Sequence, residues 1–315
     1  MQETEKIPLL CVVGPTASGK TALAVALAEA LGGEVISADS MQIYETMQIG
    51  TARPTPEEMR GVPHHLCGFL PLSQPYSVAR FVEDAAACAR EIAGRGRLPV
   101  VAGGTGLYVS SLINGIVFQE EEPDPALRES LQRRGEQEGG EALLRELAEF
   151  DPESAARLHP NNLGRIIRAI EIYRRTGCTM TEQLRRSREQ GSPYRLCMLG
   201  LTFADRAQLY RRIDLRVDGM LAAGLEEEAR RVLAMSHGAT ALQAIGYKEL
   251  APYLRGERSR EEAIELLKRE TRRYAKRQLT WFRRDERIHW LERDRCTEEE
   301  LIEQALRIVR EEPEF

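Results

Sequence analysis

Apolar runs alternate with segments of helical periodicity over the first third of the chain. The apolar stretch 7–13 leads directly into a glycine turn, which is typical of a buried strand, and 21–31 then has helical spacing and ends at two glycines. The same patterns predict strands at 34–38 and 98–102 and an amphipathic helix at 77–95 with Ser77 as its N-cap. Strands that alternate with helices predict a parallel sheet, so we expect an α/β fold.

The hydrophobic pattern changes in the middle of the chain. From 123 to 192 strand signals are absent and Leu, Arg and Glu recur at helical periods, whereas 195–202 again has the pattern of a strand. We therefore expect an all-helical domain, residues 123–192, inserted into one α/β core made of residues 1–122 and 193–315. The last part is expected to contain, in order, helices over 205–284, a short edge strand at 288–291 and a closing helix at 297–310.

The composition agrees with a globular protein and excludes several other classes. Of the 315 residues, 42% are hydrophobic and 30% are charged, which is unlike fibrous, collagen-like or disordered chains. The chain has no apolar run of about 18 residues, so we expect no membrane span, and its acidic start differs from a signal peptide. The six cysteines form no CxxC pair, which argues against a disulfide framework and a zinc site. We expect a cytoplasmic protein with reduced thiols.

Two basic stretches stand against the net charge of −5. Residues 268–287 hold nine basic and three acidic residues, and residues 157–188 hold eight and two. The first stretch has few acidic neighbours to pair with, and Trp281 and Phe282 lie near its end. Its helically spaced cations are Arg269, Arg272, Arg273, Lys276, Arg277, Arg283 and Arg284. Such a stripe suits a nucleic-acid backbone, with aromatic rings available to stack on unpaired bases, although a solvated charged face has the same pattern.

A complete phosphate-binding loop follows the first predicted strand. The sequence G-x-x-x-x-G-K-T comprises Gly14, Pro15, Thr16, Ala17, Ser18, Gly19, Lys20 and Thr21. Backbone N–H groups and the start of the next helix attract phosphate oxygens, Lys20 neutralises them, and the Thr21 hydroxyl can ligate Mg²⁺. The motif indicates a di- or triphosphate and leaves open what that phosphate is attached to.

Two further loops follow the next strands at the same predicted sheet edge. Asp39 ends the strand 34–38, where its carboxylate could accept a proton, hold a metal's water shell, or merely cap a turn. Thr105 lies in the glycine-rich segment 103–108 after the strand 98–102. Because His64 and His65 are adjacent and the other histidines lack ligand spacing, we expect no histidine metal site.

Seven motifs in order carry a resemblance to one family. GPTASGKT, SADSMQIY, IGTARP, GVPHHL, GGTGLY, HPNNLGRIIRAIEIY and KRQLTWFRR together resemble the bacterial tRNA dimethylallyltransferases, also called tRNA isopentenyltransferases. The resemblance covers nearly the whole chain, from Leu9 to about Leu291. It implies a P-loop core with an inserted helical domain. It also implies transfer of the dimethylallyl group from dimethylallyl diphosphate to N6 of adenosine-37, the adenosine 3′-adjacent to the anticodon of tRNA.

The resemblance assigns roles to individual residues. The P-loop with Lys20 and Thr21-bound Mg²⁺ would hold the diphosphate, Arg216 would also stabilise it, and Asp39 would act as general base or orient the amine, with Thr105 close by. The positions implied to contact the tRNA anticodon stem-loop are Asp39, Ser40, Met41, Gln42, Thr105, Arg128, Gly164, Arg165, Ile166, Ile167, Arg168, Gln243, Gly246, Tyr247, Lys276, Arg277, Gln278, Trp281 and Arg283. We expect a monomer without a membrane partner.

The chain departs from the family pattern at two positions. Asn162 stands where Asp is expected, so a role for a carboxylate there is in doubt, and Arg53 replaces the usual Lys with the same charge. Three other functions stay open on the residues alone. A small-molecule kinase would leave the basic stretches unexplained, a prenyltransferase for free adenylates would not need them, and an RNA-binding ATPase would turn over ATP without prenyl transfer.

Overall fold

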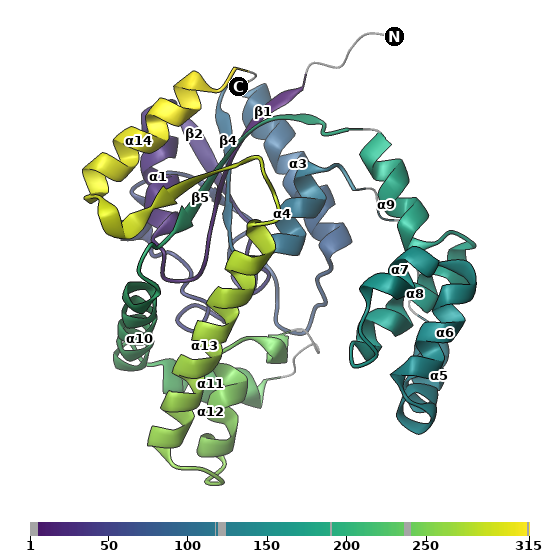
Figure 1. Ribbon diagram of the computed structural model, residues 1–315. Helices are drawn as coiled ribbons and strands as arrows, with labels where there is room; N and C mark the ends of the chain where they lie inside the picture. Colours follow the sequence, from purple (N-terminus) through teal and green to yellow (C-terminus); the bar gives the residue numbers. More distant parts are fainter. Residues whose placement is uncertain (1–5, 117, 119–123, 190, 236–240, 314) are drawn as a thin grey trace. The chain divides into compact units, whose positions relative to one another are not determined.

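The structure is a computed structural model (Figure 1), and it describes residues 6–116, 118, 124–189, 191–235, 241–313 and 315. The chain forms two compact units, one made of residues 1–113 and 193–315 and the other of residues 114–192. The first boundary expected from the sequence, at 122/123, falls outside the described residues. None of the described helices has the length and apolar character needed to cross a membrane.

A six-stranded parallel sheet forms the centre of the first unit, which confirms the α/β fold class. Its strand order is β3-β2-β4-β1-β5-β6, and every neighbouring pair is parallel. The strands are β1 (Ile7–Val13), β2 (Gly33–Ser37), β3 (His64–His65), β4 (Leu98–Gly103), β5 (Tyr194–Thr202) and β6 (Ile288–Glu292). Five of them match the predicted strands. The sequence missed only β3, because two residues are too short to show a pattern.

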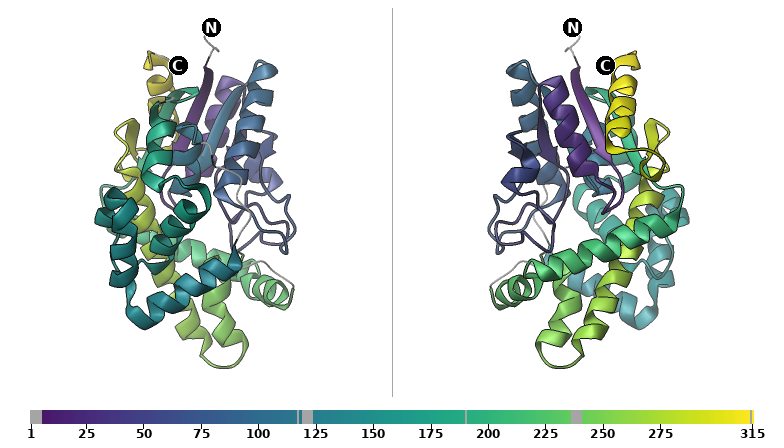
Figure 2. Two further views of the ribbon diagram at one scale, coloured as in Figure 1. Left: turned by 90° about the vertical axis from the view of Figure 1, so that its right-hand side faces the viewer. Right: turned by 90° about the vertical axis from the view of Figure 1, so that its left-hand side faces the viewer.

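Helices cover both faces of this sheet, as the two side views show (Figure 2). The first unit contains α1 (Lys20–Leu31), α2 (Pro56–Met59), α3 (Val78–Gly94), α4 (Gly106–Ile113), α10 (Arg206–Ala222), α11 (Leu225–Ala234), α12 (Tyr247–Leu254), α13 (Arg260–Phe282) and α14 (Glu298–Glu311), with short 3-10 turns at Ala241–Gln243 and Arg293–Arg295. The Ser77 hydroxyl caps α3 by accepting a hydrogen bond from the Arg80 N–H, as predicted.

The covered faces explain why the strands are continuous apolar runs. Along β1, Leu10 and Val12 pack in the hydrophobic cluster that contains α1 and α14, whereas Leu9, Cys11 and Val13 pack in the cluster that contains α3 and α4. All five side chains are fully buried. A strand with solvent on one face would alternate apolar and polar residues, so the apolar run itself indicates a central strand.

The described residues of the second unit form helices and no strand. The helices are α5 (Pro125–Glu138), α6 (Gly140–Phe150), α7 (Pro152–Arg157), α8 (Leu163–Thr176) and α9 (Met180–Glu189). Ile166 and Ile170 are fully buried in the core of this unit, and the Tyr173 ring stacks on Phe150 with the ring centres 3.9 Å apart, so this face of α8 packs inward. Asn162 is the N-cap residue of α8, but its side chain makes no capping hydrogen bond.

A buried carboxylate fixes the loop that carries the IGTARP motif. Glu228 on α11 is 2% exposed and accepts hydrogen bonds from the backbone N–H groups of Gln48 (3.0 Å), Ile49 (2.9 Å) and Gly50 (2.8 Å). It also accepts a bond of 2.7 Å from the Tyr247 hydroxyl. One side chain therefore satisfies four donors and ties the loop to α11 and α12.

We expect Glu228→Ala to lower the free energy of unfolding by at least about 2 kcal/mol, because a buried donor left without an acceptor costs roughly 1–3 kcal/mol. Urea unfolding followed by tryptophan fluorescence measures this, since Trp281 and Trp290 both lie in the first unit. The exposed neighbour Glu227→Ala is the control. An equal loss in both variants would contradict the role given to Glu228.

Candidate active site

Three loops meet at the carboxyl edge of the sheet because their strands are neighbours in the order β2-β4-β1. The P-loop follows β1, Asp39 follows β2 and Thr105 follows β4. The Thr105 N–H donates to the Ala38 carbonyl at 3.2 Å, so the second and third loops are in direct contact. The predicted convergence of these loops is confirmed, and this edge is where open α/β sheets bind ligands.

The P-loop has the backbone shape and the charge that a phosphate requires. Gly19, directly before α1, has φ = 92°, a conformation that residues with a Cβ rarely adopt. Lys20 opens the helix, and its ammonium group lies 3.4 Å from the Pro15 carbonyl. Burial lowers the pKa of Lys20 to about 8, and the Arg216 charge acts in the same direction while Asp39 opposes it. The loop thus holds a cation that an anion would stabilise.

Arg216 reaches the same place from α10. Burial lowers the pKa of its guanidinium below the usual value, and the charge of Asp39 opposes that shift. Among the described residues, neither Arg216 Nε nor the buried Ser18 hydroxyl of the P-loop has a hydrogen-bond partner. Buried polar atoms are nearly always satisfied in folded proteins, so each of these two donors indicates a partner such as a phosphate oxygen or a water molecule.

Asp39 is held with one oxygen bound and the other available. Its Oδ1 accepts a hydrogen bond of 2.9 Å from the Met41 N–H, while Oδ2 has no partner among the described residues. The next residue is braced from the third loop, because the Ser40 N–H donates to Thr105 Oγ1 at 3.1 Å and the Thr105 hydroxyl lies 3.4 Å from Ser40 Oγ. The arrangement presents a carboxylate oxygen toward Lys20 and Arg216, whose pKa values its charge affects.

Two residues of this region were missed by the sequence analysis. Arg212, one helical turn before Arg216, donates from Nε to the Ala17 carbonyl of the P-loop at 2.9 Å. Burial raises the pKa of the Tyr274 phenol, the Asp39 charge raises it further, and hydrogen-bonding contacts with Thr105 and Gln278 oppose both. The available signal was sequence spacing. Arg212 precedes Arg216 by four residues and Tyr274 precedes Gln278 by four, and residues four apart share one face of a helix.

Several residues expected at the tRNA interface have internal partners. Tyr247 is fully buried with its hydroxyl on Glu228, so its side chain is not available to RNA in this structure. The Gln42 amide donates to the Thr51 and Ala52 carbonyls at 3.2 Å. Gln278 is 4% exposed and bonded at both ends of its amide. Ser40 and Met41 are half-buried, and Gln243 is exposed.

The aromatic residues of α13 differ from the expectation. Phe282 is 2% exposed and packs in the main core, so the prediction that it is available for stacking on bases is wrong. Trp281 is half-buried, and its indole N–H donates to the Ser110 hydroxyl at 3.0 Å. The sequence could not separate these neighbours, because Phe282 faces the sheet only once the helix has docked.

The cationic stripe of α13 is partly paired, which corrects the prediction of few acidic partners. Lys268 binds Asp218 at 2.7 Å and Arg272 binds Asp214 at 2.5 Å, both across to α10. Arg273 pairs with Glu270 on its own helix. Among the described residues, four exposed cations of the stripe have no acidic partner, namely Lys276, Arg277, Arg283 and Arg284. The unpaired charge therefore lies in the second half of the helix.

The helical unit holds its own set of cations. Arg128 donates from Nε and Nη2 to the two oxygens of the buried Glu171 at 2.8 and 2.7 Å, and Arg168 lies 3.8 Å from the same carboxylate. Gly164 and Arg165 are exposed on the first turn of α8. Ile166 and Ile167 are buried, so their expected contact with RNA would not come from their side chains.

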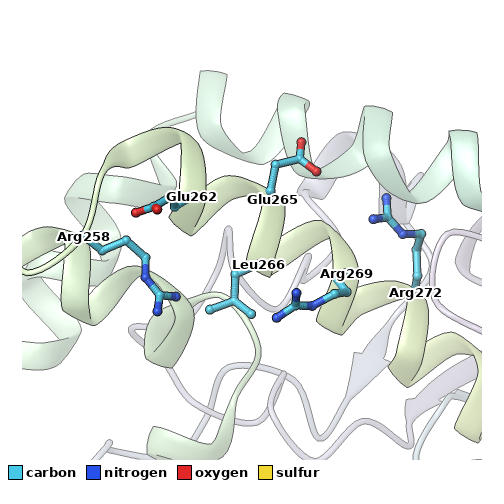
Figure 3. A pocket seen from close by; sticks show the side chains of 6 residues that line it. All are labelled: Arg258, Glu262, Glu265, Leu266, Arg269 and Arg272. Atoms are coloured by element: carbon cyan, nitrogen blue, oxygen red, sulfur yellow. The ribbon is translucent and has the colours of Figure 1, made fainter.

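A cavity of about 390 Å³ lies along the first half of α13 (Figure 3). Its lining side chains are Arg258, Glu262, Glu265, Leu266, Arg269 and Arg272. None of them belongs to the three loops at the sheet edge. Mixed charges and a lone leucine do not form the phosphate or base site that the motifs predict, so this cavity is not the candidate active site.

Comparisons with known proteins identify close relatives. A family model described as IPP transferase matches residues 42–285, and one described as isopentenyl transferase matches residues 7–66. The tRNA dimethylallyltransferase of Symbiobacterium thermophilum is 49% identical over 97% of this chain and 96% of its own length, and that of Acetivibrio thermocellus is 46% identical over 93% and 94%.

Solved structures agree with these sequence matches. The full-length tRNA isopentenylpyrophosphate transferase from Bacillus halodurans has a TM-score of 0.72 and 45% identity, covering 97% of this chain and 96% of that one. A eukaryotic dimethylallyltransferase acting on tRNA has a TM-score of 0.81 and 28% identity, covering 98% of this chain and 80% of that one. The similarity therefore extends over the helical unit as well as the sheet.

Lys20 predicts a measurable proton uptake. With a pKa of about 8 in the free protein, this amine is half-deprotonated near pH 8, and bound inorganic diphosphate favours its charged form. At that pH, wild-type protein should take up about half a proton more per bound diphosphate than Lys20→Arg, whose guanidinium stays charged. Calorimetry in two buffers of different ionisation enthalpy measures the difference. Equal uptake by the two proteins would contradict a lowered pKa at Lys20.

Proposed function

Because the chain belongs to the IPP transferase family, we propose that it transfers the dimethylallyl group of dimethylallyl diphosphate to N6 of adenosine-37 in tRNA and releases diphosphate. The observation that carries this proposal is the convergence of Lys20, Arg216 and Asp39 at one sheet edge. Two half-buried cations suit a diphosphate leaving group, and a carboxylate beside them suits an amine acceptor.

The leaving group makes the first demand on the site. As the bond between C1 of the dimethylallyl group and the diphosphate oxygen breaks, negative charge grows on the diphosphate. Lys20, Arg216 and the N–H groups at the start of α1 face that charge and stabilise it. Arg212 keeps the P-loop in shape through the Ala17 carbonyl. The departing diphosphate therefore leaves toward cations that are already in position.

The acceptor makes the second demand. The exocyclic amine of adenine is a weak nucleophile because its lone pair is delocalised into the ring. As its nitrogen bonds to C1, the proton it loses passes to Asp39 Oδ2, the oxygen that the turn leaves available. Thr105 braces the Asp39 turn through Ser40 and lies beside the same centre. An adenine stacked in a folded anticodon loop must leave its stack to reach this carboxylate.

The Thr21 hydroxyl is the protein group that fits a Mg²⁺ ion at this site. Among the described residues, no group of three His, Cys, Asp or Glu side chains could hold a metal ion, and the half-buried Thr21 hydroxyl has no hydrogen-bond partner. Mg²⁺ commonly binds through one or two protein oxygens together with substrate phosphates and water. Thr21 would hold the ion, which when bound supplies further neutralisation of the diphosphate.

Exposed cations support tRNA as the partner. Lys276, Arg277 and Arg283 are unpaired on α13 within the described residues, and Arg165 is unpaired on α8. Arg128 and Arg168 share the buried Glu171, which fixes the direction of their guanidinium groups. Ser40, Met41, Gln243 and Gly164 complete the proposed contacts at or near the surface, whereas Gly246 is buried, so a contact of its own with RNA is not supported by its exposure. We place the protein in the cytoplasm, acting as a monomer.

We expect purified protein with Mg²⁺ and dimethylallyl diphosphate to add a five-carbon group to adenosine in unmodified tRNA and not to AMP or ATP, as detected by mass spectrometry. Asp39→Asn keeps the oxygen that accepts from Met41 but removes the base, so single-turnover transfer should fall by at least about a hundredfold. Adduct on free nucleotide would move the function to small-molecule prenylation. Full activity of Asp39→Asn would remove the base from the mechanism.

The unpaired half of α13 should control the salt dependence of tRNA binding. Each lost phosphate contact lowers the slope of log K against log salt by roughly 0.7–0.9, so the double variant Lys276→Gln, Arg277→Gln should lose up to twice that amount. The matched double variant Lys268→Gln, Arg272→Gln removes cations that have carboxylate partners and should change the slope less. Filter binding over a salt series measures both. Identical slopes in all three proteins would make the stripe a solvated face.

A further inference from the structure

Gln278 joins two loops that are far apart in the sequence. Its Oε1 accepts a hydrogen bond of 2.8 Å from the Thr16 N–H in the P-loop, and its Nε2 donates to the Gly104 carbonyl at 3.0 Å in the loop that carries Thr105. The side chain is 4% exposed. The same amide therefore contacts two of the three loops of the candidate active site, the P-loop and the Thr105 loop. Both ends of the amide are engaged inside the protein, so the side chain is not placed to contact RNA.

The surroundings are shaped to fit this bridge. A Cβ on Gly104 would lie 2.0 Å from Gln278 Nε2, so only glycine allows the helix to approach the loop this closely. Trp281, three residues further along α13, lies against Gly106, where a Cβ would come within 2.3 Å of the indole. Tyr274, one turn earlier, contacts Thr105. One face of α13 thus follows Gly104 to Gly106 in the loop that carries Thr105. We call this loop the acceptor loop, because Thr105 braces the turn that holds Asp39 through Ser40.

A side-chain amide suits both partners at once. The Thr16 N–H requires an acceptor and the Gly104 carbonyl requires a donor, and glutamine offers both at the end of one flat group. Glutamate could accept from Thr16 but, when ionised, would place a carboxylate against a carbonyl and close to the diphosphate loop. Methionine has nearly the same shape and offers neither bond. Glutamine therefore matches the site in chemistry as well as size.

We propose that Gln278 is a positioning residue whose amide sets the spacing between the diphosphate loop and the acceptor loop, and so the distance over which the prenyl group is transferred. The inference rests on the proposed function and assigns Gln278 a role other than direct contact with tRNA. Transfer between two bound groups depends steeply on their separation, and a misplacement of about 1 Å can cost a hundredfold in rate. The effect of losing the bridge should therefore fall on the chemical step.

The test compares Gln278→Met with wild type and with Thr280→Val. Thr280 is exposed on the same helix, and within the described part of the chain its hydroxyl bonds to the Lys276 carbonyl alone, so its loss should leave activity unchanged. At saturating dimethylallyl diphosphate and tRNA, Gln278→Met should slow single-turnover transfer by roughly thirty- to a hundredfold. The dissociation constants of inorganic diphosphate and of tRNA should each change by less than about threefold, because the binding groups remain.

A weaker tRNA affinity with an unchanged saturated rate would overturn the proposal and make Gln278 a direct RNA contact. A saturated rate within about threefold of wild type would also overturn it. If Gln278→Met does not fold, Gln278→Glu replaces it, since it keeps the acceptor for the Thr16 N–H and loses the donor for Gly104. That variant should show the same loss of saturated rate with an unchanged tRNA affinity, while its carboxylate should also weaken the binding of inorganic diphosphate.

A second measurement does not depend on activity. In hydrogen exchange, Gln278→Met should lose protection in residues 14–21 and in residues 103–106 together, while Thr280→Val should match wild type. Loss of protection in neither loop, or in only one, would overturn the bridge. If wild-type protein fails to modify tRNA, the proposed function fails while this measurement still decides whether Gln278 couples the two loops.

Discussion

Two half-buried cations beside the P-loop, Lys20 and Arg216, are the constraint around which the rest of the site is arranged. Burial disfavours the charges of Lys20 and Arg216, as the directions of their pKa shifts show, and Asp39 relieves the cost only in part. A protein accepts such a cost where a ligand removes it. Diphosphate would do so, because its charge and its several oxygens match the two cations, the start of α1 and the unsatisfied Ser18 hydroxyl. The free site is thus electrostatically incomplete, and it gains most when the leaving group has its full charge.

The rest of the fold fixes the relative positions of the loops that carry these charged groups. Parallel pairing of β2, β4 and β1 brings three loops to one edge, yet loops alone would leave their spacing loose. Side chains remote in sequence supply the missing restraint. Gln278 of α13 joins the first loop to the third, and Thr105 of the third loop joins it to the second. Glu228 plays the corresponding role for the loop at 48–50. Each of these restraints crosses more than sixty residues of sequence, so the folded core is what holds the chemistry in place.

The sequence predicts features that depend on interactions between neighbouring residues, and it fails for features that depend on contacts between distant parts of the chain. The apolar run of β1, the P-loop and the cap at Ser77 depend on neighbouring residues, and all three are predicted correctly. The pairing of Arg272 with Asp214 and the burial of Phe282 depend on how α13 docks, which no local pattern contains. The same holds for Gln278, whose motif resembles a tRNA-contacting segment while its side chain points into the core. Motif resemblance therefore points to a segment, whereas the side-chain burial in the folded chain decides which face of that segment is available to a ligand.

The helix α13 combines the two tasks that a tRNA prenyltransferase has to perform. Its inner face, Tyr274, Gln278 and Trp281, contacts the acceptor loop, and its outer face carries the unpaired Lys276 and Arg277. These two sets interleave along one rigid helix. A polyanion bound to the outer cations would therefore contact the same helix, α13, whose Gln278 sets the spacing between the P-loop and the acceptor loop. A free nucleotide has too few phosphates to span that face. The helix therefore offers a physical reason for transfer to depend on RNA, because the phosphate backbone of an RNA acceptor would bind the outer cations and stabilise the helix that positions the reacting groups.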